Sequence, residues 1–298
     1  MIAFNPLTPL FGAETFDVDL SRPLTDAAFA AIEQAFYAHQ VLALRGQRIT
    51  AAQFADFARR IGPPQPHVID QFHHPEDPNI LILSNVKQNG QPTGLQDAGS
   101  YFHTDYSYLA VPARATTLYS RVVPRVGGDT LFANQIAAYD DLPEAMKRRI
   151  EPLLAVHHYG NRNDVNEASR TAASVLNDAQ KARLPVITHR IARPHPRTGR
   201  KALYAVSGSS FGIVGMPDDE ARGLLDELAA HATQPRYQLR FKYGVGDIVV
   251  WDNAALLHSA TLTDPADART LWRITVLETS GEAAAPSVLA PTFAAGPM

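Results

Sequence analysis

The chain contains no cysteine among its 298 residues. Disulfide bonds and thiolate metal ligands are therefore excluded, so any metal would have to be held by histidine and carboxylate side chains. The formal net charge is only -3, which does not indicate a nucleic-acid partner or an acidic membrane surface. The start of the chain has no basic stretch, and no apolar run is long enough to cross a bilayer. We therefore expect no signal peptide, no membrane span and a cytoplasmic location.

Hydrophobic residues make up 45% of the chain, which is enough for a sizeable core. No repeat and no long biased linker divides the sequence. We expect a single domain over residues 1–280, because β-rich barrels of this length are often undivided. Residues 281–298 are rich in alanine and proline and are predicted to form a flexible tail.

Three helices are predicted from capping residues and apolar periodicity. Thr25 is suited to cap a helix that carries Phe29, Ile32 and Phe36 on one face. Thr50, with a glutamine three residues later, has the pattern of a capping box. A third helix is predicted from Asp218 to Ala232, where leucines form an apolar stripe.

Much of the remaining chain reads as short strands separated by turn signals, which favours a sandwich or barrel such as the jelly roll. Gly127-Gly128-Asp129 has the composition of a tight connection. The polar stretch from Asn161 to Arg183 is predicted to be a surface helix or a lid. The predicted strands are Val41–Leu44, Ile80–Ser84, Ala115–Val123, Val186–Ala192, Ala202–Val206, Tyr237–Lys242, Ile248–Trp251 and Ile274–Glu278.

His103 and Asp105 are separated by one residue, so on an extended segment their side chains would point to the same face. Such a segment can present two ligands to one metal. The triplet alone is weak evidence, because it also arises by chance and could be an exposed polar turn. A rival His-x-Glu, His74-Pro75-Glu76, lies in a proline-rich stretch where a strand is not expected.

His258 follows the apolar run at residues 248–251 and is the third candidate ligand. Alone, such a histidine could simply be satisfied by a backbone hydrogen bond. Arg269 and Arg273 follow it in an apolar segment and would share one face of a strand, although paired arginines can also be solvated. Two histidines and a carboxylate are the ligands of non-haem Fe(II) oxygenases, and an arginine can hold a carboxylate co-substrate.

Together these residues and several ordered motifs resemble the TauD/TfdA family of Fe(II)/2-oxoglutarate-dependent dioxygenases. The resemblance runs from about Pro9 to Glu278, and Arg269 lies 11 residues after His258, as in the family. Phe102 departs from the family pattern, which often has tryptophan there. The matched motifs are Phe102-His103-Thr104-Asp105, Gly127-Gly128-Asp129-Thr130-Leu131-Phe132-Ala133-Asn134, His195-Pro196-Arg197-Thr198-Gly199-Arg200-Lys201-Ala202-Leu203-Tyr204 and Gly246-Asp247-Ile248-Val249-Val250-Trp251-Asp252-Asn253.

The resemblance implies a mainly β fold with flanking helices, a double-stranded β-helix (jelly roll, cupin-like). It implies that His103, Asp105 and His258 are the catalytic residues that bind Fe(II). It also implies that Arg269 and Thr130 bind the 5-carboxylate of 2-oxoglutarate. Arg273 would lie near the substrate anion or the other end of 2-oxoglutarate. The substrate side is predicted to include His74, Tyr106, Tyr108 and Arg273.

The implied reaction consumes O2 and 2-oxoglutarate, releases succinate and CO2, and hydroxylates a small anionic molecule. Candidate substrates are a sulfonate, a sulfate ester, an aryloxyalkanoate or another carboxylic acid. The same centre could instead perform desaturation, epimerisation or ring closure. A jelly-roll protein that binds a small molecule without catalysis is the non-enzymatic alternative. A homodimer or homotetramer is expected from the family.

Overall fold

The computed structural model of the protein describes residues 2–96, 99–159, 176–177, 179–180, 184 and 186–279. Its largest element is an eight-stranded sheet, in which only the β2–β3 pair is parallel. The strands of this sheet, in spatial order, are β1 (Asn5–Pro6), β2 (Ala13–Thr15), β3 (Val41–Leu44), β16 (Ile248–Asp252), β8 (Ala113–Val122), β18 (Thr270–Leu277), β5 (Asp77–Ser84) and β4 (His73–His74).

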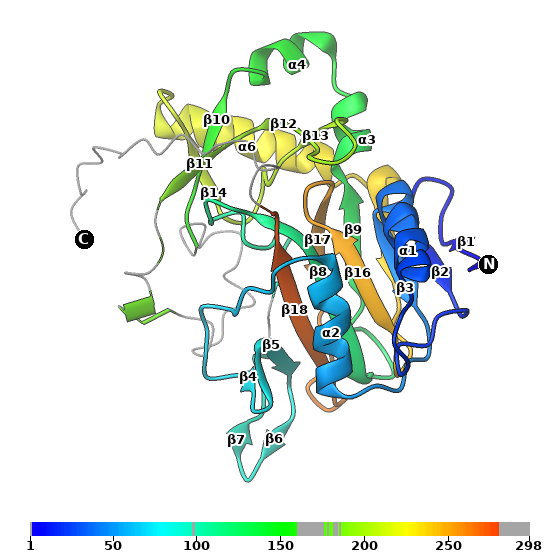
Figure 1. The fold of residues 1–298 in the computed structure, drawn as a ribbon. Coiled ribbons are helices and arrows are strands. Elements are labelled where there is room, and N and C mark those ends of the chain that lie inside the picture. Colours follow the sequence, from blue (N-terminus) through cyan, green and yellow to red (C-terminus); the bar gives the residue numbers. More distant parts are fainter. Residues whose placement is uncertain are drawn as a thin grey trace.

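A smaller antiparallel sheet of three strands faces the large one (Figure 1). Its order is β15 (Gln238–Phe241), β9 (Thr130–Asn134) and β17 (Leu256–Ala260). Phe132 of β9 belongs to the same buried cluster as Trp251 of β16 and Leu271 of β18, so the two sheets share one core. The protein is therefore a jelly roll, and the functional residues described below line the space between its sheets.

Helices α1 (Asp26–His39) and α2 (Ala51–Ile61) cover the outer face of the large sheet (Figure 1). The predicted caps are present: the Thr25 hydroxyl accepts from the backbone of Ala28, and Thr50 forms a reciprocal capping box with Gln53. Phe54 of α2 packs with the outward side chains of β3 and β16 in a second buried cluster.

Most of the remaining elements form a third layer around a separate buried cluster, in which Leu224, Leu225 and Leu228 of α6 take part, whereas an exposed hairpin at residues 87–92 lies apart from it (Figure 1). Helix α6 occupies Asp218–Ala232, as predicted from its leucine stripe. The other elements are α3 (Gln135–Asp140), α4 (Glu144–Ile150), η3 (Pro235–Tyr237), β10 (Leu154–His157), β11 (Ile187–Arg190), β14 (Ser210–Ile213), the hairpin of β12 (Ala192–Pro194) with β13 (Lys201–Leu203), and the hairpin of β6 (Lys87–Gln88) with β7 (Gln91–Pro92).

Two expectations about strands were wrong. Strand β18 begins at Thr270 rather than at Ile274, because residues 270–273 pair with both β8 and β5. The proline-rich stretch also contains strand structure: β4 is followed by β5, which starts at Asp77. Proline is tolerated there because it occupies the second position of a strand near the edge of the sheet.

Some expectations fall outside the described residues. The tail at 281–298 and most of the predicted lid or surface helix at 161–183 belong to this group. None of the helices in the described part of the chain combines the length and the hydropathy that a membrane span requires.

Candidate active site

His103 and His258 are brought together by backbone pairing. The two residues form an isolated antiparallel bridge, with reciprocal N–H to carbonyl hydrogen bonds of 3.0 and 2.9 Å. Directly paired residues place their side chains on the same face, and the two ring centroids are 4.2 Å apart. The extended segment considered for residues 103–105 does not continue to Asp105, which begins a turn.

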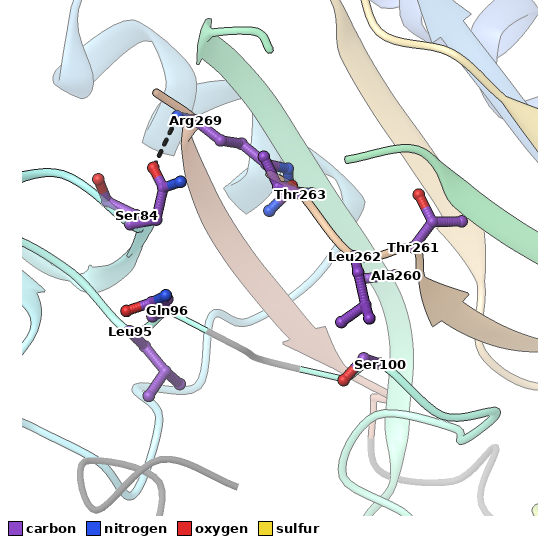
Figure 2. Close-up of a pocket in the computed structure, with 10 residues that line it drawn as sticks. Ser84, Leu95, Gln96, Ser100, Ala260, Thr261, Leu262, Thr263 and Arg269 are labelled. Atoms are coloured by element: carbon purple, nitrogen blue, oxygen red, sulfur yellow. Dashed lines mark hydrogen bonds between the residues drawn. The ribbon is translucent and has the colours of Figure 1, made fainter. Parts of the chain in front are cut away.

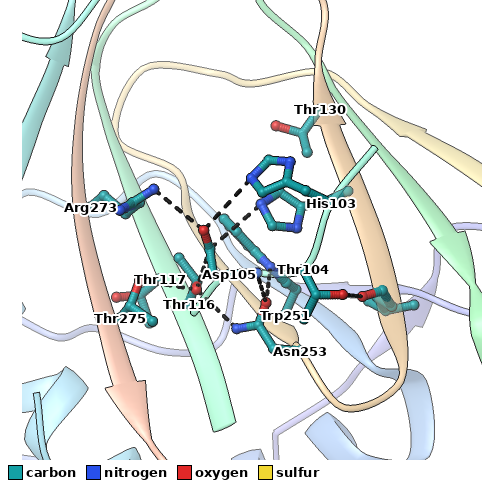
Figure 3. A network of polar contacts seen from close by, with 12 residues as sticks. His103, Thr104, Asp105, Thr116, Thr117, Thr130, Trp251, Asn253, Arg273 and Thr275 are labelled. Atoms are coloured by element: carbon teal, nitrogen blue, oxygen red, sulfur yellow. Dashed lines mark hydrogen bonds and ion pairs between the residues drawn. The ribbon is translucent and has the colours of Figure 1, made fainter. Parts of the chain in front are cut away.

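The Asp105 carboxylate faces both imidazole rings (Figure 3). Its Oδ1 lies 3.7 Å from His103 Nε2, and its Oδ2 lies 3.5 Å from His258 Nε2. Burial alone would raise the pKa of Asp105, but Arg273 and the two histidines outweigh it and hold that pKa well below its usual range. The carboxylate is therefore an anion at neutral pH.

The ring nitrogens of both histidines fit a divalent metal. His103 Nδ1 lies 2.8 Å from the Tyr101 carbonyl, so it donates a hydrogen bond there and Nε2 is the ring nitrogen that faces Asp105. Burial, together with His103, lowers the pKa of His258 to about 3, so its imidazole is neutral. Ligand atoms of the three residues all lie within 4.8 Å of one another. Two imidazoles and one carboxylate match the ligand set of non-haem Fe(II) oxygenases.

One cavity joins these residues to both arginines. Its lining includes His103, His258, Thr130, Arg269 and Arg273. Arg273 donates to Asp105 Oδ1 over 3.4 Å, whereas its buried Nη2 has no hydrogen-bond partner in the part of the chain that the structure describes. The cavity therefore combines a candidate metal site with two cationic hydrogen-bond donors. Arg273 lies next to Asp105, and Arg269 is the second cation in the lining.

Arg269 is the cation at the far end of the cavity. Its Nε donates to the Gly128 carbonyl over 3.2 Å, and its backbone N–H donates to Asn85 over 2.8 Å (Figure 2). Burial lowers the pKa of Arg269, although the guanidinium remains charged at neutral pH. No carboxylate lies within ion-pair distance of it among the described residues. A half-buried cation without an anionic partner is suited to receive a carboxylate ligand.

Thr130 lines this end of the cavity, and Tyr243 contacts Thr130. The two hydroxyls are 2.7 Å apart, and both residues are buried. Burial raises the pKa of Tyr243 to about 12, so the phenol keeps its proton and can donate a hydrogen bond. Tyr243 was not predicted from the sequence, because it follows β15 outside any of the recognised motifs.

A cluster of aromatic rings lies on the other side of Asp105. Tyr106 stacks on His67 with ring centroids 6.0 Å apart, and Tyr108 contacts Tyr159 at 5.0 Å. Arg273 lies 6.0 Å from the centroid of the Tyr106 ring. The sequence-predicted residues Tyr106, Tyr108 and Arg273 are thus brought together beside the candidate metal ligands.

His74 does not join this group. Its ring packs against Trp272 at 4.6 Å, and Trp272 belongs to the cluster on the helix-covered face of the large sheet. Because neighbouring residues on a strand point to opposite faces, Trp272 and Arg273 face away from each other. His67 faces the site instead. Burial and the nearby Arg273 hold its pKa well below its usual range, so it is neutral.

Comparisons with known proteins agree with this geometry. A family model described as taurine catabolism dioxygenase TauD, TfdA family, matches residues 3–275. The alpha-ketoglutarate-dependent 2,4-dichlorophenoxyacetate dioxygenase of Cupriavidus pinatubonensis (strain JMP 134 / LMG 1197) is 33% identical over 93% of this chain and 98% of its own. The alpha-ketoglutarate-dependent sulfate ester dioxygenase of Pseudomonas putida is 30% identical over 91% of this chain and 88% of its own.

Solved structures show the same similarity. The crystal structure of AAD-2 in complex with Mn(II) and N-oxalylglycine superposes with a TM-score of 0.78 at 29% identity, covering 95% of this chain and 100% of that one. A taurine dioxygenase from Burkholderia xenovorans gives a TM-score of 0.75 at 29% identity, with 93% and 91% covered. The family match extends over almost the whole described fold. The chain thus belongs to the TauD/TfdA family and is an Fe(II)- and 2-oxoglutarate-dependent dioxygenase.

Proposed function

We propose that this enzyme hydroxylates a small anionic substrate that carries an aromatic ring, and that the substrate binds in the cavity between the two sheets. His103, Asp105 and His258 are the proposed Fe(II) ligands. The observation that supports this most directly is the shared lining of one cavity by both histidines and both arginines. Fe(II), when bound, supplies the oxidation in which O2 and 2-oxoglutarate yield succinate, CO2 and one oxygen atom for the substrate.

The protein contributes binding, orientation and charge. Arg269 is assigned to one carboxylate of 2-oxoglutarate, with the hydroxyls of Thr130 and Tyr243 as additional donors. Arg273 is assigned to the substrate anion, since its Nη2 is buried and has no partner among the described residues. Both assignments rest on the chemistry of a buried guanidinium, which favours a bidentate carboxylate.

The aromatic cluster narrows the substrate class. Tyr106, Tyr108, Tyr159 and His67 form a connected cluster of rings beside Arg273, and flat rings of this kind pack well against an aryl group. His67 Nδ1 accepts from the Ile69 backbone, so its Nε2 carries the proton and can donate to an anion. An aryloxyalkanoic acid has both the ring and the carboxylate, and the relative from Cupriavidus pinatubonensis is named for such a compound.

The co-substrate assignment is tested by Arg269→Ala. We expect the KM for 2-oxoglutarate to rise at least tenfold, about 1.4 kcal/mol, because the far carboxylate loses its cation. The rate of 2-oxoglutarate-dependent O2 consumption over a range of 2-oxoglutarate concentrations measures this effect. Arg240→Ala is the matched control, since Arg240 pairs with Asp129 and is not part of the cavity lining. An unchanged KM in the Arg269 variant would remove the assignment.

The proposed function as a whole is tested by anaerobic visible absorption. Fe(II) and then 2-oxoglutarate are added, and a weak charge-transfer band that requires both is expected from chelation of the keto acid. Phenoxyacetate is expected to shift the band more than methanesulfonate at equal concentration, because only phenoxyacetate carries a ring. No band from folded protein would refute the metal and co-substrate assignments. An equal response to both acids would refute the aromatic substrate class.

Two further properties stay predictions. A homodimer or homotetramer is expected, and size-exclusion chromatography with light scattering would distinguish these from a monomer. A cytoplasmic location is likewise retained as a prediction, to be tested by fractionation of the source cell.

A further inference from the structure

Besides the two histidines and Arg273, the Asp105 carboxylate contacts a short series of buried, hydrogen-bonded side chains (Figure 3). The Thr116 hydroxyl donates to Asp105 Oδ2 over 2.7 Å. The Asn253 side-chain amide donates to Thr116 Oγ1 over 3.0 Å. Thr116 and Asn253 are 0% and 1% exposed, so water does not compete with these bonds.

The direction of this chain is fixed by the surroundings of Asn253. Its Oδ1 faces two donors, the Trp251 indole N–H at 3.2 Å and the Asp105 backbone N–H at 3.4 Å. The amide nitrogen must therefore point to Thr116. Because Thr116 Oγ1 accepts from that nitrogen, its own hydrogen is available for the Asp105 carboxylate.

A second hydroxyl supports the same orientation. Thr275 Oγ1 lies 3.2 Å from Thr116 Oγ1 and makes no hydrogen bond to Asp105 within the described structure. The Thr116 oxygen can accept from Asn253 and Thr275 together, which leaves its single hydrogen for Asp105. Side chains from β8, from the turn after β16 and from β18 thus converge on the Thr116 hydroxyl, which contacts Asp105 Oδ2.

We propose that Thr116, oriented by Asn253, is the positioning residue that holds the Asp105 carboxylate in its metal-binding orientation. The inference rests on the proposed role of Asp105 as a ligand. Asp105 itself lies in a turn rather than in a strand, so its backbone alone does not fix the carboxylate. Partners that orient a ligand side chain commonly change metal affinity by about 10–100-fold when they are removed.

The experiment measures the dissociation constant of Mn(II), used alone as the probe, by isothermal titration calorimetry. Thr116→Val keeps the shape of the side chain and removes the hydroxyl, and we expect the dissociation constant to rise by about 10-fold or more. Thr116→Ser is expected to return it close to the wild-type value. Thr117→Val is the matched control, because this neighbour is equally buried and donates to the Ile274 carbonyl instead.

The outcomes separate the positioning role from general damage. Asn253→Leu, a second variant, is expected to weaken Mn(II) binding less than Thr116→Val, since Thr116 keeps its hydroxyl but loses its fixed direction. Thermal unfolding in EDTA checks that each variant is folded. The proposal would be overturned if Thr116→Val and Thr117→Val weakened Mn(II) binding equally. It would also be overturned if the Mn(II) dissociation constant of Thr116→Val lay within twofold of the wild-type value. Absence of Mn(II) binding by the wild-type protein would instead overturn the metal site itself.

Discussion

Two buried clusters of polar side chains are linked by the short segment 105–109, and they differ in the contacts made by their central residues, Asp105 and His157. Around Asp105, the carboxylate oxygens are contacted by Thr116, Arg273 and the two histidines. Around His157, both ring nitrogens of a fully buried histidine lack hydrogen-bond partners within the described residues. The first cluster is connected through directional contacts, whereas the second consists mainly of ring packing.

The second cluster is built from aromatic and cationic groups. His157 packs against His189 with centroids 5.3 Å apart, and Arg193 lies over the Tyr204 ring at 4.5 Å. His189 Nε2 lies 3.1 Å from the Leu109 carbonyl, which connects this cluster to the segment after Tyr108. Polar atoms without partners cost free energy when buried. The comparison therefore predicts that substitutions damage function in the first cluster and change mainly stability in the second.

The largest effect is expected from Asp105→Ala. The variant removes the only carboxylate among the candidate metal ligands, and we expect hydroxylation to be abolished. Product formation from the best substrate, followed by mass spectrometry, measures this. Asp129→Ala serves as a control, since Asp129 pairs with Arg240 away from the metal ligands. Retained hydroxylation would refute Asp105 as an essential ligand.

A smaller effect is expected when the pH is lowered. Burial lowers the pKa of His189 from 6.5 to about 4 and holds that of His157 well below its usual range. The unfolded chain therefore binds protons at a higher pH than the folded chain. Stability is full above pH 6.5 and is lost as the pH falls through the folded pKa values. Urea unfolding at several pH values should show this decline.

The share of this decline that is due to His157 can be measured separately. In His157→Phe, one titrating group is removed from the second cluster, so the free energy of unfolding should fall less steeply between pH 6.5 and pH 4. If the free energy of unfolding fell with pH equally steeply in the variant and the wild type, His157 would not be a neutral, buried residue in the folded protein.

The smallest effect is expected from His157→Phe at pH 8. The substitution keeps a ring and removes two nitrogens that have no partner among the described residues. We expect the free energy of unfolding to change by less than about 1 kcal/mol, or to increase. Urea unfolding measures it. A loss above about 2 kcal/mol would show that these nitrogens are paired in solution.

Much of the fold was predictable because its signals are local. The Thr25 and Thr50 caps, the α6 stripe and the apolar run of β16 all depend on neighbouring residues. The extent of β18 was not predictable, because its first residues become a strand only by pairing with β5 and β8. Long-range pairing of this kind leaves little trace in the local sequence.

The candidate site follows the same division. His103, Asp105, His258 and the two arginines were recognisable from their spacing and family motifs. The place of His67 rather than His74 beside the site was not, because it depends on which face of the large sheet each ring reaches. His74 packs on Trp272, whereas His67 stacks on Tyr106. Asn253 lay in a recognised motif, but only the folded chain shows it beside Thr116.

Tyr106 has a consequence for anyone who wishes to redirect this enzyme to new substrates. It is a buried aromatic residue with a φ of 51°, a left-handed conformation that costs roughly 1–2 kcal/mol for most side chains. It also follows Asp105 directly, so relaxing its backbone would move the candidate ligand. Libraries that vary Tyr108 and Tyr159 can change the aromatic cluster without altering the backbone next to Asp105. Position 106 is best restricted to residues that tolerate positive φ, such as glycine and asparagine.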